Sequence, residues 1–363
     1  MSDAKVWLNA LLDQMVDMQG SDLHLTSGVE PYMRLNNDIV MLDEKIIPPE
    51  NVDEMVRSLL TTYQIETFER QQSVDMAFFS DRDDRFRANV FRQRGTSAAV
   101  IRHLQGGSQT MNELMLPPQL HELSEYHHGL VLVTGATGSG KSTTLSTILN
   151  RINETRASHI LTIEDPIEFI HQNKKSLIRQ RELHSDVPCF GDALRAALRE
   201  DPDVILVGEM RDLDTIRAAI TAAETGHLVF STLHTGSASA AISRVISQFP
   251  AAEQSTVRMQ LATCLKAVVS QRLVHRSDNT GRVPIIELMI VNSAIANLIR
   301  TGDTAQIHSV MQTGLKDGMI IVEHSLACLV VHGILDLQDA ERLASDPNIL
   351  HSRIEMIREP MSV

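Results

Sequence analysis

Residues 135–142 read Gly135-Ala136-Thr137-Gly138-Ser139-Gly140-Lys141-Ser142, a complete G-x-x-x-x-G-K-S motif. An apolar run, Leu130–Val133, precedes the motif, and a helix-compatible run, Thr143–Leu149, follows it. Glycine lets the backbone curl so that successive N–H groups point inward at phosphate oxygens, and the N-terminus of the following helix adds partial positive charge. The order of strand, loop and helix therefore predicts a phosphate-binding loop within an α/β domain.

The motif assigns a distinct task to each polar side chain. We expect Lys141 to reach the β- and γ-phosphates of ATP and Ser142 to supply a hydroxyl oxygen to Mg²⁺. Thr143 is a neighbouring phosphate contact, and the backbone from Gly135 to Gly140 forms the cradle. The predicted cofactors are therefore ATP and Mg²⁺, and the predicted activity is Mg-dependent ATP hydrolysis.

A second element, residues 201–212, delivers a carboxylate from an apolar strand. Asp201-Pro202 is expected to stop the preceding helix, Val204–Val207 reads as a buried strand, and Glu209 follows that strand. Ligands gather at the carboxyl ends of strands in open α/β sheets. Glu209 is therefore the candidate Walker B acid and the second candidate Mg²⁺ ligand.

A third element, residues 160–168, places more acids just past another apolar strand. Hydrolysis needs a base or an orienting group for water near the γ-phosphate. Glu164 and Glu168 are both candidates for this task, and the residues alone do not choose between them. Asp165 precedes Pro166, so a turn-forming role is an equal alternative for it.

A fourth element, residues 221–235, carries His227 and His234 on either side of the apolar run Leu228–Leu233. Because they are seven residues apart, the two histidines lie on opposite faces of an ideal strand and are not expected to share a metal. Each histidine alone is more typical of a hydrogen-bonded structural residue. Beside the other elements, His234 is the candidate γ-phosphate sensor.

Hydrophobic patterning indicates two globular units. Residues 1–110 mix amphipathic helix patterns with short alternating strands, which is typical of an α+β domain. Residues 111–128 read as a linker, and residues 129–290 contain four apolar runs that predict a largely parallel sheet covered by helices. Residues 291–363 are mainly helical in pattern.

Composition limits the function classes. The chain has 363 residues, of which 43% are hydrophobic, enough for a substantial core. Its three cysteines are too few and too widely spaced for a disulfide framework or a Cys-x-x-Cys metal site, which favours the reducing cytoplasm. A formal net charge of −13 argues against nucleic acid as the main partner, and no secretory or membrane-spanning segment is expected.

Together the four elements, in this order, resemble those of the secretion-type motor ATPases, most closely the pilus retraction branch. Further matches are Gly20–Leu25, Pro31–Arg34, Arg85–Phe91, Pro250–Glu253 and the region from Gln306 to Gly314. The resemblance implies a PAS-like N-terminal domain, a RecA-like core with a helical end, and a homohexamer that powers pilus retraction and twitching motility. It also implies a cytoplasmic protein that meets the inner membrane through a platform protein at the pilus base.

By the same resemblance, Glu168 falls on the catalytic glutamate of the Asp box, Glu209 on the Walker B acid, and His227 and His234 on the His-box histidines. Arginines of the N-terminal unit are candidates for reaching a phosphate across a domain or subunit boundary: Arg82, Arg85, Arg87, Arg92 and Arg94. Alternative functions are a pilus extension or type II secretion motor, an accessory paralogue that works beside a principal retraction ATPase, and, more remotely, a nucleic-acid translocase.

Two departures from the family pattern lie outside these elements. The chain has Ala294-Ile295-Ala296 where the branch usually has Ala-Ile-Arg, and Ile320-Ile321-Val322 where it usually continues Gln-Thr. The first change removes a planar charged group, and the second makes a polar position apolar and suited to helix packing or partner contact. We expect both to affect coupling to the pilus rather than ATP chemistry.

Overall fold

The computed structural model of the chain describes residues 3–36, 38–43, 45–104 and 109–358. Contacts divide the chain into two compact units. The first is Met1–Gly107 together with the short segment Pro166–Ile170, and the second is Ser108–Asp165 with His171–Val363. No helix within the described residues is both long enough and apolar enough to cross a bilayer.

Within its described residues, the first unit is a six-stranded antiparallel sheet with three helices. The sheet has the order β3-β2-β1-β6-β5-β4. Helix α1 buries Leu8, Leu11, Leu12 and Met15, which recur at helical spacing, and β5 buries every second residue. Its elements are α1 (Asp3–Asp17), β1 (Asp22–Thr26), β2 (Tyr32–Leu35), β3 (Asp38–Met41), α2 (Pro49–Leu59), α3 (Thr62–Gln71), β4 (Ser73–Phe79), β5 (Arg85–Gln93) and β6 (Thr96–Leu104).

The second unit is built on a seven-stranded sheet of order β13-β12-β7-β11-β10-β8-β9. Neighbouring strands from β12 to β9 are parallel, and only β13 is antiparallel to its neighbour β12. The strands are β7 (Gly129–Thr134), β8 (His159–Glu164), β9 (Leu177–Glu182), β10 (Val204–Val207), β11 (Leu228–Leu233), β12 (Leu265–His275) and β13 (Arg282–Ile290).

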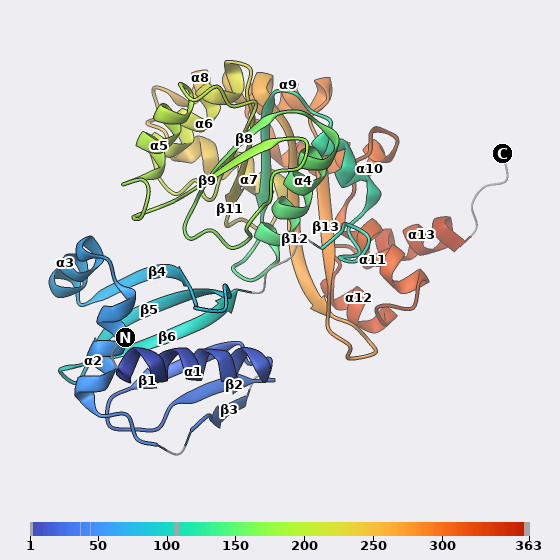
Figure 1. Cartoon of the computed structure of the whole chain (residues 1–363). Coiled ribbons are helices and arrows are strands. Elements are labelled where there is room, and N and C mark those ends of the chain that lie inside the picture. The colour runs from blue at the N-terminus through green and yellow to red at the C-terminus, as the bar shows by residue number, and fades with distance from the viewer. Residues whose placement is uncertain (1–2, 37, 44, 105–108, 359–363) are drawn as a thin grey trace. The chain divides into compact units, whose positions relative to one another are not determined.

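Helices cover both faces of this sheet (Figure 1). The first part of the unit contains the 3₁₀ segment η1 (Pro118–Ser124) and the helices α4 (Lys141–Thr155), α5 (Phe190–Ala197), α6 (Leu213–Glu224), α7 (Ala238–Ser247) and α8 (Gln254–Cys264). The C-terminal region contains α9 (Ser293–Thr301), η2 (Thr304–Gln306), α10 (Ile307–Thr313), η3 (Gly314–Asp317), α11 (Val322–Val331), α12 (Leu337–Leu343) and α13 (Pro347–Arg358).

Burial on both faces explains the continuous apolar runs in the sequence. In β7, Leu130 and Leu132 pack with α6 and α7, whereas Val131 and Val133 pack with α4. A parallel strand covered on both sides needs apolar residues at every position. The predicted fold class, an α/β core with a parallel-rich sheet between a smaller α+β domain and a helical C-terminal region, is confirmed.

The apolar departure at residues 320–322 belongs to the core and not to a partner surface. Ile320 is 2% exposed and exchanges two 2.8 Å backbone hydrogen bonds with Leu288 of β13. Ile321 and Val322 are also buried, at the start of α11. Of the two predicted uses, packing is right and partner contact is wrong, because these side chains are not accessible.

Candidate functional site

The phosphate-binding loop joins the end of β7 to the start of α4, as the motif predicts. Gly135, Gly138 and Gly140 have φ values of 151°, 74° and 84°, a range that favours glycine. A Cβ at Gly135 would lie 2.2 Å from the carbonyl oxygen of Gln271, and a Cβ at Gly140 would lie 2.7 Å from Gln271 Nε2. The glycines are therefore required by conformation and by the close approach of β12.

Polar groups in the loop fit a phosphate ligand. Lys141 is only 9% exposed, and its Nζ donates to the carbonyl oxygens of Gly135 at 2.9 Å and Ala136 at 3.0 Å. Ser139 Oγ is buried and makes no hydrogen bond to the described residues. The N-terminus of the 15-residue helix α4 adds N–H groups without helical partners.

Access to the loop is also suitable for a nucleotide. Ala136, Thr137 and Gly138 are exposed at its tip, and Ser142 and Thr143 are partly exposed in the first turn of α4. The hydroxyl of Ser142 and the carboxylate of Glu209 are the hard oxygen ligands that Mg²⁺ prefers. The residues present therefore fit ATP and Mg²⁺.

Glu209 and His234 come together at the carboxyl ends of neighbouring strands. Glu209 follows β10, His234 follows β11, and His234 Nε2 lies 3.1 Å from Glu209 Oε1. The other carboxylate oxygen is 2.8 Å from Arg211 Nε. The Walker B candidate and the candidate sensor are thus in direct contact.

Hydroxyl groups fix the strand ends that carry this pair. Thr232 Oγ1 donates to the Gly208 carbonyl oxygen at 2.6 Å, which ties β11 to the residue before Glu209. Thr134, the last residue of β7, accepts from the backbone N–H of Thr235 at 2.9 Å. The phosphate loop, Glu209 and the His234 segment therefore begin from one rigid edge.

His227 lies at the other end of β11. Its backbone oxygen accepts from Gly129 N–H at the start of β7, and its Nδ1 is 3.0 Å from the Ala222 carbonyl oxygen of α6. In the parallel register, Leu233 and not Leu228 pairs with Thr134. The structure therefore does not bring His227 to the phosphate loop within one chain.

The two candidate bases belong to different units. Glu164 ends β8, and its Oε1 accepts from Thr162 Oγ1 at 2.6 Å and from Gln180 Nε2 at 3.2 Å. Glu168 lies in the segment Pro166–Ile170, which belongs to the first unit. In this segment the Ile167 carbonyl oxygen accepts a hydrogen bond from Arg85 Nε at 3.1 Å. Asp165 is exposed between the two acids.

Contacts within the first unit distinguish the candidate arginines. Arg82 is 3.1 Å from Asp17, Arg87 is 3.8 Å from Asp75, and Arg92 donates to Ser97 Oγ at 3.1 Å. Arg94 is exposed and makes no hydrogen bond or ion pair with any described residue. Arg94 is therefore the candidate whose charge is not engaged inside its own unit.

Gln271 is a site residue that sequence reasoning missed. It lies in β12, one residue past the last position paired with β7, is 3% exposed, and uses both ends of its amide. Oε1 accepts from Thr144 Oγ1 of α4 at 2.7 Å, and Nε2 donates to the Ser139 carbonyl oxygen at 2.8 Å. The only signal in the sequence is a lone amide in a mostly apolar run.

Glu287 of β13 holds the segment that follows His234. Its Oε1 accepts from the backbone N–H of Ala238, the first residue of α7, at 2.7 Å. Burial raises the pKa of the Glu287 carboxyl, and the hydrogen bond from Ala238 opposes that shift. The antiparallel hairpin β12–β13 therefore supports both the phosphate loop and the start of α7.

Comparison with known proteins places this geometry in a family. The family of type II/IV secretion system proteins matches residues 4–342. The "Type IV pilus retractation ATPase PilT" of Pseudomonas aeruginosa strain PAO1 is 46% identical over 327 residues, which cover 90% of this chain and 95% of the relative. A "Twitching motility protein" of Neisseria gonorrhoeae is 44% identical over 348 residues, 94% of this chain and 93% of the relative.

A solved structure has the same fold across nearly the whole chain. It is described as the "Pilus Retraction Motor PilT and Bound ADP" and superposes with a TM-score of 0.87 at 42% identity. The superposition covers 95% of this chain and 99% of that chain.

The contacts of Gln271 generate a prediction. Gln271→Glu keeps the size of the side chain and its acceptor for Thr144 but removes the donor to the buried Ser139 carbonyl. Loss of a buried hydrogen bond costs about 1–3 kcal/mol, so we expect the Kd for ATP to rise about tenfold, measured with a fluorescent ATP analogue. The matched control is Gln260→Glu, whose amide contacts Glu224 on α6. Unchanged affinity in a folded Gln271→Glu protein would remove Gln271 from the site.

Proposed function

Since the chain belongs to the type II/IV secretion system protein family, we propose that it is an ATP-hydrolysing motor that powers type IV pilus retraction and twitching motility. The observation that carries the proposal is the nucleotide edge, with the phosphate loop at β7 and the contact between Glu209 and His234 at β10 and β11. This edge stands in a chain that matches one relative named as a pilus retraction ATPase over 90% of its length and one named as a twitching motility protein over 94%.

The site residues divide the chemistry among them. Lys141 and the loop N–H groups bind the phosphates of ATP. Ser142 and Glu209 would hold Mg²⁺, which would offset phosphate charge. Glu168 accepts a proton from a water molecule. The oxygen of that water forms a bond to the γ-phosphorus as the bond between the γ-phosphorus and the leaving oxygen of ADP breaks. Glu164 is already engaged by Thr162 and Gln180, which supports Glu168 as the base.

His234 is proposed to report the state of the γ-phosphate. Its contact with Glu209 joins the candidate metal ligand to the segment that leads into α7. A movement of Glu209 on loss of the γ-phosphate would therefore shift His234 and this segment. His227 lies at the far end of β11, and any catalytic duty of His227 would have to be carried out away from its own phosphate loop.

Assembly completes the proposed motor. We propose a homohexamer in which an arginine from an N-terminal unit reaches a phosphate, with Arg94 the favoured candidate. The ring would work at the cytoplasmic face of the inner membrane, on a platform protein of the pilus base. It would bind ATP, and nucleic acid is not among its expected partners. The Ala296 departure in α9 supports a second possibility, an accessory paralogue of a principal retraction ATPase.

Replacement of single site residues separates binding from turnover. Lys141→Ala removes the phosphate contact and should abolish ATP binding. Glu168→Gln should retain binding but slow phosphate release by about 10²-fold or more, as expected on losing a general base. Glu164→Gln is the matched control. Normal hydrolysis by Glu168→Gln with slow hydrolysis by Glu164→Gln would reverse the assignment of the base.

Deletion of the gene tests the direction of the motor. We expect deleted cells to accumulate surface pili because extension continues without retraction, and electron or fluorescence microscopy of the pili measures this. Bald cells would instead show that the chain drives extension. Normal pili with lost protein secretion would support a secretion motor.

The Ala296 departure is tested by restoring the family's arginine. Ala296 is half-buried on α9, outside the nucleotide edge, so Ala296→Arg should change pilus retraction while the ATPase rate moves by less than about twofold, near 0.4 kcal/mol in barrier height. The control is Asn297→Arg, which adds the same charge at the exposed next position. A large change in hydrolysis, with retraction merely following it, would place α9 in the catalytic machinery.

A further inference from the structure

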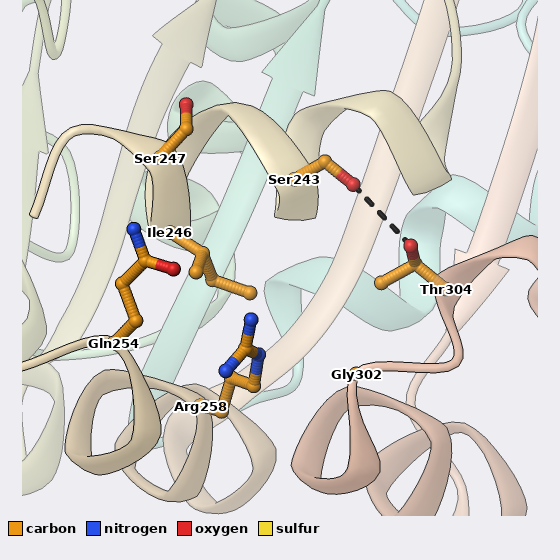
Figure 2. A pocket seen from close by; sticks show the side chains of 7 residues that line it. All are labelled: Ser243, Ile246, Ser247, Gln254, Arg258, Gly302 and Thr304. Atoms are coloured by element: carbon orange, nitrogen blue, oxygen red, sulfur yellow. Dashed lines mark hydrogen bonds between the residues drawn. The ribbon is translucent and has the colours of Figure 1, made fainter. Parts of the chain in front are cut away.

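A small surface pocket lies away from the nucleotide edge, between α7, α8 and the turn from α9 into η2. Its volume is about 170 Å³, below the range of sites for nucleotide-sized ligands. Figure 2 shows the side chains that line it: Ser243, Ile246, Ser247, Gln254, Arg258, Gly302 and Thr304.

Arg258 of α8 is the charged group of this pocket. Its Nε is buried without a hydrogen-bond partner, and the guanidinium makes no hydrogen bond or ion pair with any described residue. A Cβ at Gly302, where φ is 86°, would lie 3.4 Å from Nε, so the guanidinium packs against bare backbone. Protein atoms cover Nε, so a ligand can reach only the Nη groups of the guanidinium, which have no partner among the described residues. An arginine without an acidic partner leaves these donors for a ligand.

The remaining lining groups are neutral and add donors. Ser243 Oγ and Thr304 Oγ1 are 3.4 Å apart, so one of the two hydroxyls keeps its hydrogen for a ligand. Gln254 Nε2 donates one hydrogen to the Phe249 carbonyl oxygen at 3.1 Å and has a second. No acid lines the pocket, and Asp303, between two lining residues in the chain, is not part of the wall.

We propose that this pocket binds one carboxylate, presented by an acidic side chain of the protein on which the motor acts. A guanidinium fork matches a planar carboxylate in two parallel hydrogen bonds. The pocket offers a single positive charge and neither a lysine nor a glycine-rich loop, which suits a carboxylate of charge −1 better than a phosphate of charge near −2.

The position of the pocket gives the ligand a route to the motor's moving parts. Helix α7 begins just after the segment that carries His234, and α9 carries Ala296 just before the turn at Gly302. A carboxylate bound to Arg258 would therefore lie beside α7, which follows the nucleotide edge, and beside the turn that follows α9. Carboxylate binding stands alone, whereas the identity of its donor rests on the proposed function.

Carboxylate binding is tested on the full-length protein with ¹⁵N-labelled arginine. The Arg258 Nε–H resonance, assigned by its absence from Arg258→Lys, is followed by NMR during titration with sodium acetate, sodium phosphate or sodium chloride at constant ionic strength. We expect a saturable shift with acetate, at least tenfold weaker binding of phosphate and no saturation with chloride. No saturable acetate shift would overturn the site, and tighter binding of phosphate would make it a phosphate site instead.

The donor of the carboxylate is tested in cells. Arg258→Gln should lower the frequency of pilus retraction at least tenfold while the purified protein hydrolyses ATP within twofold of the parent rate, which also shows that it folds. The control is Arg244→Gln, which removes the same charge from an exposed position on α7 and should retract normally. Normal retraction by Arg258→Gln would overturn the partner contact. Gene deletion without any change in pili would overturn the proposed function but leave the acetate result intact.

Discussion

The carboxyl ends of four parallel strands meet at one edge of the sheet, and the rest of the site depends on that constraint. The order β7-β11-β10-β8 brings the phosphate loop, His234, Glu209 and Glu164 to the same side. Both faces of these strands are buried under helices, so polar side chains reach solvent only where the strands end. Thr134 and Thr232 then lock the strand ends to one another with hydrogen bonds across the edge.

The hairpin β12–β13 extends this edge toward the C-terminal region. Gln271 of β12 holds the phosphate loop and α4, Glu287 of β13 holds the first residue of α7, and Ile320 pairs with β13 just before α11. These are buried contacts with little freedom to adjust independently. They link the nucleotide edge to the start of α7 and to the residues just before α11.

Local patterns predicted much of this arrangement, and distant contacts account for the rest. The glycine spacing and the apolar runs predicted the loop and four parallel strands, because each signal is contained in a few neighbouring residues. Gln271 could not be predicted, since its partner Ser139 is 132 residues away in sequence. The assignment of Pro166–Ile170 to the first unit also depends on a distant contact, with Arg85, 82 residues from Ile167. Burial of Ile320 required the pairing with Leu288, which no periodicity in the sequence indicates.

In the proposed motor, ATP hydrolysis at this edge supplies the work of pilus retraction. The most direct test is the retraction speed of fluorescently labelled pili in cells whose sole copy of the protein is a variant with a graded hydrolysis rate. Speed should fall in step with the hydrolysis rate measured on each purified variant and reach zero when hydrolysis does. Retraction at normal speed in cells whose only copy cannot hydrolyse ATP would contradict the account.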